Sequence, residues 1–373
     1  MLILFNKCLD KSETMQKIFV ILFFLFFIMG CREKPLPSNP IDSVEKYYFP
    51  NLNDNYWETK SPVGLGWDTA KLNEAFDFAG SKNTYGLIIL QNGRLVKEKY
   101  WNNWDLNTRY YIASAGKSVV SFLTGIAQQD QLLNINNKTS DYLGVGWTSL
   151  PLAKENLITV KHQLSMTTGL DDGVSNPDCE DPACLNYVAD AGTRWAYHNA
   201  PYRLLQDVIA NVSGMTFNQY CSQKLFQKIG MSSSFWYNNV MYCTTREAAR
   251  FGSLILNKGT WNGNIILNDS NYFKAMVNSS QSFNNSYGYL WWLNGKSSFM
   301  VPTLQTVFTG SLATNAPSDM IMALGKDDKK IYVIPSLNVV VVRLGDSAGN
   351  APLLGPSSFD NELWTKLKYA MRY

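Results

Sequence analysis

Histidine is scarce in this chain of 373 residues, which contains only His162 and His198. Zinc sites are built mainly from histidine and cysteine, so these two histidines and six cysteines offer no convincing zinc cluster. We therefore expect no metal and no other cofactor. Neither histidine has an aspartate partner in an obvious place, which argues against a Ser-His-Asp triad. We expect both histidines to be structural.

Dense runs of lysine and arginine are also missing. The chain has 33 basic and 30 acidic residues and a net charge of +3, without a basic block of the kind that binds nucleic acids. We therefore expect no nucleic-acid partner. With 46% hydrophobic and 17% charged residues the composition is that of a globular protein, long enough for one large domain or two small ones.

The apolar run at 18–29 is too short to span a membrane, which takes roughly 20 apolar residues. It follows Lys17 and ends just before Cys31, a pattern typical of a secretory signal. Its last residues resemble a bacterial lipobox, which would put a lipid anchor on Cys31; an ordinary cleavable signal or a membrane anchor is the alternative. We expect Met15 to be the true start. Arg32 after the cysteine favours the periplasmic face of the outer membrane.

Export would place the protein in an oxidising compartment, where disulfides persist. Cys179 and Cys184 bracket the short sequence CEDPAC and are candidates for a local disulfide. Cys221 and Cys243 could pair or stay buried and free, and the sequence does not decide between these alternatives.

The remaining chain divides into a Pro/Asn/Asp-rich tether at 32–60 and a domain at 61–373. Asp68 can cap a helix that runs to about residue 80, and Asn92-Gly93 is a strong hairpin signal between two β-rich runs.

Helices are expected in the middle of the domain and strands at both of its ends. The expected helices are 114–129, 159–167, 199–213 and 216–229, one from a capping box at 244–247 to about 257, and a last one at about 359–371. The later strands are 287–293, 320–325, 330–334 and 338–344. We therefore predict an α/β (α+β) fold: one antiparallel sheet from 61–110 and 245–373, a mostly helical insertion at 111–244, and a pocket at their seam.

Ser114 and Lys117 form a Ser-x-x-Lys pair, and their spacing puts both on one face of a helix. A buried lysine with a lowered pKa can take the proton of a serine hydroxyl, and free amides at a helix N-terminus can donate to an oxyanion. The small residues Ala113, Ala115 and Gly116 should leave room for a substrate. A second copy of the pattern at 43–46 lies in the tether, and we interpret it as chance.

Tyr197 and Asn199 form a Tyr-x-Asn pattern where a loop enters a helix. A tyrosine at such a junction can reach into a pocket as a proton shuttle, with Asn199 as an amide donor. The same pattern occurs at Tyr100 and Tyr237, where we expect aromatic packing instead.

Taken together, Ser114 to Lys117 and Tyr197 to Asn199 resemble the serine β-lactamase and penicillin-binding-protein superfamily. The resemblance is closest to the branch of class C-like esterases, D-aminopeptidases and 6-aminohexanoate-dimer hydrolases, and it covers most of 61–373. Supporting stretches are HQLSMTTGLDD at 162–172, GTRWAYHNAPYRLL at 192–205, TREAARFGSLIL at 245–256, YGYLWWL at 287–293 and KIYVIPSLNVVVVRLG at 330–345.

The resemblance implies that Ser114 is the acylated nucleophile, Lys117 its base and Tyr197 the acid that protonates the leaving group, while Asn199 helps to position the substrate. The family's third motif, Lys-Thr-Gly or His-x-Gly, is not matched. Its remnant could be at 308–310 or at 323–326, and we prefer the latter.

In that interpretation Gly325 permits a close approach, and the Lys326 amide joins that of Ser114 in an oxyanion hole; the Lys326 side chain could instead be a solvated turn residue. The missing Lys-Thr pair argues against efficient β-lactamase activity.

We therefore expect a lipid-anchored serine hydrolase that acts through an acyl-enzyme on an ester or small amide. One alternative is a D-amino-acid or cell-wall peptide hydrolase with weak β-lactamase activity. Another is a non-catalytic envelope binding protein on the same fold. The presence of Ser114, Lys117 and Tyr197 together favours an enzyme, whereas the altered third motif favours a relative that has lost its catalytic activity. The Asp171-Asp172 pair is expected to anchor the loop that carries the cysteines.

Overall fold

The computed structural model describes residues 45–349 and 356–373. The chain divides into two units, 1–46 and 47–373, and the architecture below is that of the second. The predicted leader, including the lipidation candidate Cys31, lies outside the described residues. Packing begins at Tyr47, within the segment predicted as a tether: Trp57 is buried and its indole N–H donates to the Gly93 carbonyl at 2.6 Å. None of the described helices has the length and apolarity needed to cross a membrane.

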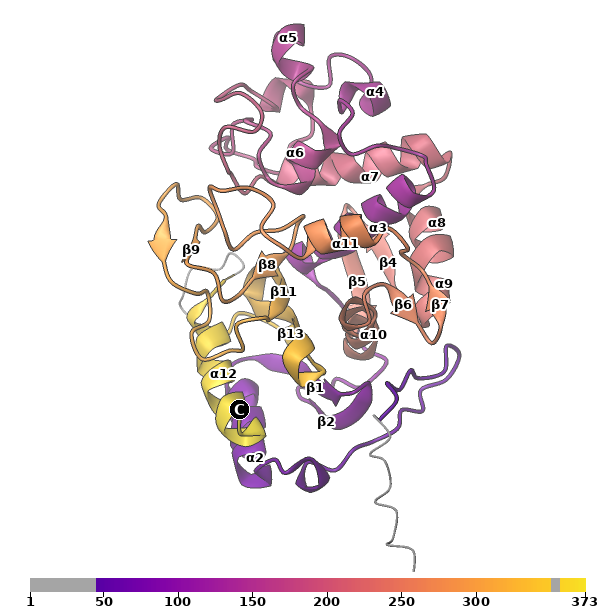
Figure 1. Cartoon of the computed structure of the whole chain (residues 1–373), viewed down its shortest axis with the longest axis vertical. Helices are drawn as coiled ribbons and strands as arrows, with labels where there is room; N and C mark the ends of the chain where they lie inside the picture. The colour runs from indigo at the N-terminus through magenta and orange to yellow at the C-terminus, as the bar shows by residue number, and fades with distance from the viewer. Residues whose placement is uncertain (1–44, 350–355) are drawn as a thin grey trace, which may run out of the picture. The chain divides into compact units, whose positions relative to one another are not determined.

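A six-stranded antiparallel sheet is the centre of the fold (Figure 1). Its order is β2 (Arg94–Tyr100), β1 (Thr84–Gln91), β13 (Val339–Gly345), β12 (Lys329–Ile334), β11 (Ile321–Gly325) and β8 (Trp292–Leu293). Because β1 pairs directly with β13, the sheet joins the two ends of the domain, as the sequence predicts. Asn92 and Gly93 both have positive φ, 52° and 80°, the conformation of a two-residue hairpin turn.

Helices cover both faces of this sheet. On one face α10 (Thr245–Leu256) lies so close that a Cβ on Gly252 would be 2.6 Å from Val340. On the other face α12 (Ser358–Met371) packs beside α2 (Thr69–Ser81), and Trp364 contacts Tyr332 edge-to-face (Figure 1). Every residue of β12 and β13 is therefore buried, which explains their continuous apolar runs.

Caps fix the helix starts that the sequence predicts. The Asp68 carboxylate accepts from the Lys71 amide at the start of α2, and Thr244 and Glu247 form the capping box of α10.

The mostly helical part lies beside the sheet. It contains α3 (Gly116–Gln129), α4 (Ser140–Leu143), α5 (Leu152–Glu155), α6 (Val160–Leu164), α7 (Asn199–Ser213), α8 (Phe217–Cys221) and α9 (Gln227–Ile229). Residues 116–127 of α3 are all buried, so this helix is the centre of that part. A later helix, α11 (Ser270–Met276), contacts α3.

Some element boundaries differ from those predicted. A π-helical turn at 222–226 separates α8 from α9, where one helix is predicted. Helix α6 ends early because Met166 is left-handed (φ 58°), and only the last two residues of 287–293 form a strand because Leu290 is left-handed (φ 59°).

Short strands occur where none is predicted. A sheet of β3 (Arg109–Tyr111), β5 (Val240–Thr244) and β4 (Phe235–Tyr237) borders the helical part. Two small hairpins are formed by β6 (Thr260–Trp261) with β7 (Asn264–Ile265), and by β9 (Ser298–Phe299) with β10 (Phe308–Thr309).

Candidate active site

Ser114 lies in a 3-10 turn, Ala113–Ala115, that leads directly into α3. Ala113 has φ of 48°, a left-handed conformation that costs a non-glycine residue about 1–3 kcal/mol and is common at functional sites. Ser114 itself is half-buried. Ala115 and Gly116 pack inwards, and a Cβ on Gly116 would be 3.0 Å from the Trp236 ring. Their small size thus serves internal packing, which corrects the prediction that they leave room for a substrate.

The Lys117 side chain contacts Ser114 inside the protein. Its Nζ donates hydrogen bonds to Ser114 Oγ at 2.9 Å and to Asn199 Oδ1 at 2.8 Å, and it lies 4.0 Å from the centre of the Tyr202 ring. Only 2% of Lys117 is exposed. Burial lowers the pKa of its ammonium from 10.5 to about 7, because an apolar environment disfavours the charged form.

Two charged side chains adjust this pKa in opposite directions: the Asp178 carboxylate raises the pKa of Lys117, and the Arg203 guanidinium lowers it. Arg203 is ion-paired with Glu180 at 2.6 Å and with Asp178 at 3.5 Å. The charges nearest the lysine therefore largely compensate each other, and desolvation remains the main cause of the shift.

Tyr197 approaches Ser114 from the loop before α7. Burial raises the pKa of its phenol well above the usual value, and a hydrogen bond with Ser114 opposes that shift. The ring stacks on Trp292 at 5.8 Å and meets Tyr287 edge-to-face at 6.2 Å. Trp195 contacts all three of these rings. Tyr197 is thus held by an aromatic cluster that keeps it protonated at neutral pH.

Asn199 is the first residue of α7, where its side chain accepts from Lys117. Asn199 is therefore a hydrogen-bond partner of Lys117, a contact that the sequence does not reveal. Tyr202, one turn further along α7, was missed by the sequence reasoning, although its i, i+3 spacing from Asn199 places both on one helix face.

Gly325 is the last residue of β11 and lies against the turn Ala113–Ala115 that contains Ser114, called the serine turn below. A Cβ at Gly325 would lie 2.3 Å from the Ile112 carbonyl oxygen and 3.2 Å from the Ala115 nitrogen, so only glycine fits without a shift. Within β11, strand β8 pairs with Ile321 and Met322, so this pairing ends before the part of β11 that reaches the turn. The other candidate segment, 308–310, lies in the exposed β9–β10 hairpin and outside the six-stranded sheet.

The turn after Gly325 contains Lys326, Asp327 and Asp328. Lys326 is exposed, and both aspartates are left-handed with φ of 59°. The Asp327 carboxylate accepts from the Tyr111 hydroxyl at 3.2 Å and from Lys329 Nζ at 3.4 Å. Sequence reasoning missed Tyr111 and Lys329; a lysine at the start of a buried strand was the available signal.

The two histidines lie at helix starts. His162 takes part in the capping box of α6 with Thr159, and His198 is the N-cap residue of α7. Burial lowers the pKa of both rings, that of His198 to about 4. Among residues 45–349 and 356–373, no group of three His, Cys, Asp or Glu side chains could hold a metal ion.

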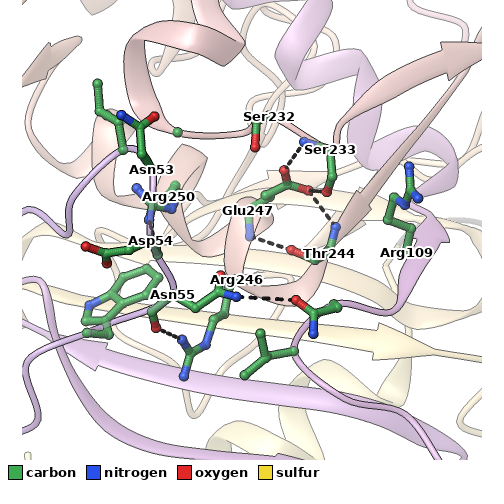
Figure 2. Close-up of a pocket in the computed structure, with 15 residues that line it drawn as sticks. Asn53, Asp54, Asn55, Arg109, Ser232, Ser233, Thr244, Arg246, Glu247 and Arg250 are labelled. Carbon is green, nitrogen blue, oxygen red and sulfur yellow. Dashed lines mark hydrogen bonds between the residues drawn. The ribbon is translucent and has the colours of Figure 1, made fainter.

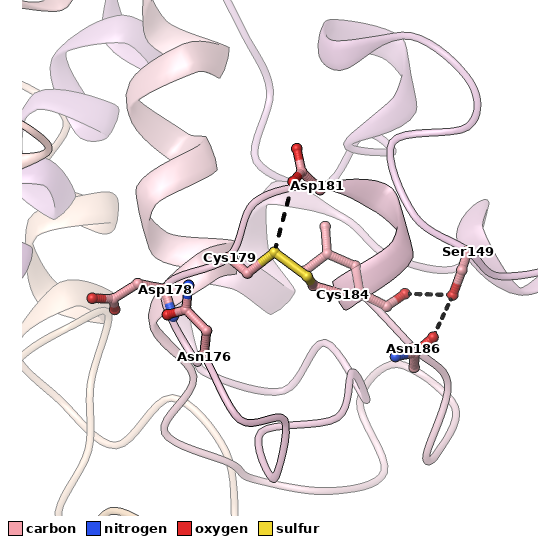
Figure 3. Close-up of a disulfide and its surroundings, with 8 residues drawn as sticks. Ser149, Asn176, Asp178, Cys179, Asp181, Cys184 and Asn186 are labelled. Carbon is pink, nitrogen blue, oxygen red and sulfur yellow. Dashed lines mark hydrogen bonds between the residues drawn. A yellow bond between two sulfur atoms is a disulfide. The ribbon is translucent and has the colours of Figure 1, made fainter.

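Cys179 and Cys184 are joined by a disulfide in the loop before α7 (Figure 3). Cys221 and Cys243 are free and buried, and burial raises the pKa of both thiols. In the same loop region Asp172 is ion-paired with Arg194 at 2.5 Å.

A cavity of about 390 Å³, drawn in Figure 2, lies apart from these residues: neither Ser114, Lys117 nor Tyr197 lines it. Most of its charged side chains already have hydrogen-bond partners within the protein, and Arg109 lies over the Phe235 ring. Arg246 pairs with Glu98, and the Glu247 carboxylate accepts from the backbone amides of Ser233 and Thr244. This cavity therefore provides no alternative centre for the chemistry.

A family model described as Beta-lactamase matches residues 69–299, which is more than half of the chain. An uncharacterized protein of Alkalihalophilus pseudofirmus is 23% identical over 322 residues, covering 75% of this chain and 88% of the relative.

Two solved structures are similar in fold. One, from Bacillus anthracis and assigned as a 6-aminohexanoate-dimer hydrolase, has a TM-score of 0.62 at 18% identity and covers 86% of this chain and 85% of its own. The other, a penicillin-binding protein from Bacillus halodurans, has a TM-score of 0.58 at 15% identity, covering 80% and 99%. The predicted α/β (α+β) fold is thus confirmed, and it is the β-lactamase/transpeptidase-like fold that the resemblance implies. The chain belongs to the beta-lactamase family, within the superfamily of serine beta-lactamases and penicillin-binding proteins.

Proposed function

We propose that this protein is a serine hydrolase that acts through an acyl-enzyme on an ester or small amide. One observation carries the proposal: a lysine that is 2% exposed, with its pKa lowered to about 7, lies 2.9 Å from the hydroxyl of Ser114. About half of such a lysine is neutral at pH 7, and a neutral amine can accept the serine proton. An ordinary lysine, with a pKa near 10.4, would be almost fully charged.

In acylation, neutral Lys117 takes the Ser114 proton while Oγ forms a bond to the substrate carbonyl carbon. The carbonyl π electrons move to its oxygen, and the amides of Ser114 and Lys326 donate to that oxyanion. When the oxyanion collapses, the bond to the leaving group breaks. The Tyr197 hydroxyl protonates the leaving group, and Lys117 returns a proton to Tyr197, so that no net charge is left on the protein.

In deacylation a water molecule takes the place of the leaving group. Neutral Lys117 accepts one of its protons, relayed through the Tyr197 hydroxyl, as the oxygen attacks the acyl carbon. When the bond to Ser114 Oγ breaks, Lys117 returns that proton to the released serine oxygen. The raised pKa of Tyr197 suits an acid that starts each cycle protonated. Asn199 holds the lysine amine in place through the 2.8 Å hydrogen bond.

The substrate class follows from the altered third motif. In our interpretation the segment 323–326 takes the place of the family's Lys-Thr-Gly motif and lacks its Lys-Thr pair, so the usual partner of a β-lactam carboxylate is missing. An ester or amide without that carboxylate fits better, which agrees with the 6-aminohexanoate dimer named for the Bacillus anthracis protein. The second candidate is hydrolysis of D-amino-acid or cell-wall peptides, favoured by the likeness to a penicillin-binding protein and by the predicted export signal.

We further propose that the protein is a lipoprotein anchored through Cys31 at the periplasmic face of the outer membrane, on the strength of the lipobox-like sequence alone.

Labelling with a fluorophosphonate probe tests the nucleophile. The chain from residue 32 onward and its Ser114→Ala variant are treated with the probe, and the adduct is located by mass spectrometry. The matched control is Ser118→Ala, which removes a buried serine in the next turn whose hydroxyl donates to the Leu290 carbonyl. We expect labelling of the wild type and of Ser118→Ala and none of Ser114→Ala.

An unlabelled wild type would contradict the assignment of Ser114 as nucleophile and favour a non-catalytic binding protein. Equal labelling of all three proteins would also contradict that assignment. Competition by penicillin against the label then separates a β-lactam-recognising enzyme from one that prefers simple esters and amides.

A further inference from the structure

Arg343 stands in the middle of the apolar strand β13 and is 0% exposed. Burying a guanidinium is costly unless its N–H groups find acceptors. All five donors of Arg343 are satisfied: Nε donates to Thr84 Oγ1 at 3.0 Å, and the two Nη atoms donate to four backbone carbonyls. Its hydrogen bonds thus go to one hydroxyl and to backbone, which is the pattern of a residue that fixes the path of the chain.

Two of these carbonyls belong to the turn beside Ser114. Nη1 donates to the carbonyl oxygens of Asp327 and Asp328, each at 2.9 Å. Both residues are left-handed, a conformation that aspartate adopts more readily than most residues but that is still uncommon outside glycine, so the hydrogen bonds to their carbonyls help to fix it. The other two carbonyls, of Lys82 and Asp346 at 2.7 Å each, lie just before β1 and just after β13. Arg343 therefore ties the turn to the paired central strands.

The same turn, residues 326–328, also contacts the segment that leads into Ser114. The Asp327 carboxylate accepts from Tyr111, which lies three residues before Ser114, and the chain at Gly325 fits against Ile112 and Ala115. Lys326 stands between these two attachments. The direction of its amide N–H is thus set by the sheet through Arg343 and by the serine turn through Tyr111 and Gly325.

We propose that Arg343 is a positioning residue for catalysis: it holds the backbone of 326–328 so that the Lys326 amide faces the carbonyl oxygen of a substrate bound at Ser114. This inference rests on the proposed function. It predicts that loss of the guanidinium lowers the rate of acylation more than it weakens substrate binding, because the amide acts on charge that develops only in the transition state.

The test is the hydrolysis of p-nitrophenyl acetate by the wild type, Arg343→Lys and Arg250→Lys. Lysine keeps the charge but cannot span the turn and the central strands at once. We expect kcat of Arg343→Lys to fall by about 100-fold, the usual cost of losing one oxyanion donor, with KM within about threefold of the wild type. The pH at which kcat/KM is half-maximal should stay unchanged, because Lys117 is untouched.

Arg250 is the matched control because it is an equally structural, buried arginine. It is 5% exposed, and its Nη atoms donate to the backbone carbonyls of Pro50, Asn51, Asp54 and Ile229, beside the cavity of Figure 2. Arg250→Lys should lower the melting temperature without lowering kcat. An equal fall in kcat for both variants, or a rise in KM alone for Arg343→Lys, overturns the proposal.

A milder variant keeps the proposal testable where Arg343→Lys does not fold. Thr84→Val removes the acceptor of Arg343 Nε at nearly constant volume, and we expect a fall in kcat of about threefold to tenfold, in line with the loss of one hydrogen bond. Unchanged kcat in this variant then overturns the proposal. Failure of the proposed function is distinguishable, since in that case the wild type itself neither hydrolyses the ester nor labels at Ser114.

Discussion

At the scale of single residues, burial supplies the chemistry of Lys117. The amine is surrounded by the rings of Tyr197 and Tyr202 at 4.8 and 4.0 Å, and by the oxygens of Ser114 and Asn199. Neither oxygen belongs to a carboxylate, so its direct hydrogen-bond partners do not hold the ammonium in its charged form. This arrangement leaves the lysine partly neutral near pH 7, as the proposed base must be, without help from a histidine.

The pH dependence of the rate follows from that pKa. Lys117 must be neutral to accept the serine proton, so kcat/KM should rise as pH increases through about 7 and level off above it. One decade of rate per pH unit is expected on the acid side. Initial rates of p-nitrophenyl acetate hydrolysis between pH 5 and pH 9 measure this directly. The rate of ester hydrolysis without enzyme is subtracted at each pH.

Lys117→Met serves as the reference for the same measurement. It should lose most activity at every pH while retaining the fold, because methionine fills the space of a buried neutral lysine. A wild-type profile that is flat across pH 6 to 8, or one that falls as pH rises, would contradict the assignment of Lys117 as the base.

The spacing of residues in the sequence identified Ser114, Lys117 and Tyr197 as candidates, and these three side chains lie together in the structure. What spacing could not reveal is the partner of each polar group. Asn199 was expected to help position a substrate as an amide donor, and the structure adds that its carbonyl oxygen accepts from Lys117. Arg343 carried a weak signal, a charged residue inside the run VVVVRLG, whose meaning depends on carbonyls that are distant in sequence.

At the scale of elements, the approach of β11 to the serine turn decides whether the two halves of the site meet. Gly325 has φ of −114°, which any residue can adopt, so the need for glycine here is a matter of space alone. Its Cα lies against the backbone of Ile112 and Ala115, and backbone cannot move aside as a side chain can.

Gly325→Ala should therefore separate β11 from Ser114. The added Cβ would lie 2.3 Å from the Ile112 carbonyl oxygen, and relief of that clash requires a shift of several tenths of an ångström or more. Misplacement by about 1 Å can cost roughly 100-fold in rate, so we expect kcat to fall by about that factor. Gly64→Ala is the control, because its nearest neighbour is 3.8 Å away on the exposed side of a short turn. Equal activity of both variants would show that the close approach does not matter.

Elements with a strong local signal were predictable, and those without one were not. Helices α2 and α10 have side-chain caps, Asp68 and Thr244, that can be read from the sequence. Strands β3 and β4 have three residues each, too few for an alternating pattern, and they form because β5 lies between them. The break between α8 and α9 leaves no mark in the sequence, since none of residues 222–226 is glycine or proline.

At the scale of the whole domain, the sheet can be assembled only when the two ends of the domain meet. Strand β1 pairs with β13, and one hydrophobic core runs from Phe76 in α2 through Phe122 in α3 to Trp364 in α12. The sequence predicted this closure from strands at both ends of the domain. It could not predict the charged contacts that join α12 to the sheet, because their members are about 30 residues apart in unrelated segments.

One group of these contacts is centred on Asp360, which is 2% exposed and lies in the first turn of α12. Its carboxylate accepts from Lys330 Nζ at 3.0 Å, from the Tyr332 hydroxyl at 2.6 Å and from the Ser357 amide at 2.8 Å. It thus caps its own helix and compensates a lysine that is 0% exposed within the sheet. Removing one partner of a buried ion pair leaves the other poorly compensated, at a cost of about 3–5 kcal/mol.

Asp360→Ala should therefore lower the free energy of unfolding by about 3–5 kcal/mol, measured by urea denaturation with tryptophan fluorescence. Glu362→Ala, two residues further along the same helix at an exposed position, should change it by less than about 0.5 kcal/mol. Lys330 keeps Asp328 at 3.2 Å as a second carboxylate, so a loss below about 1 kcal/mol for Asp360→Ala would mean that Asp328 alone compensates the lysine. In that case α12 would be held by its apolar face, Leu363, Trp364 and Leu367, and not by the buried charges beneath its first turn.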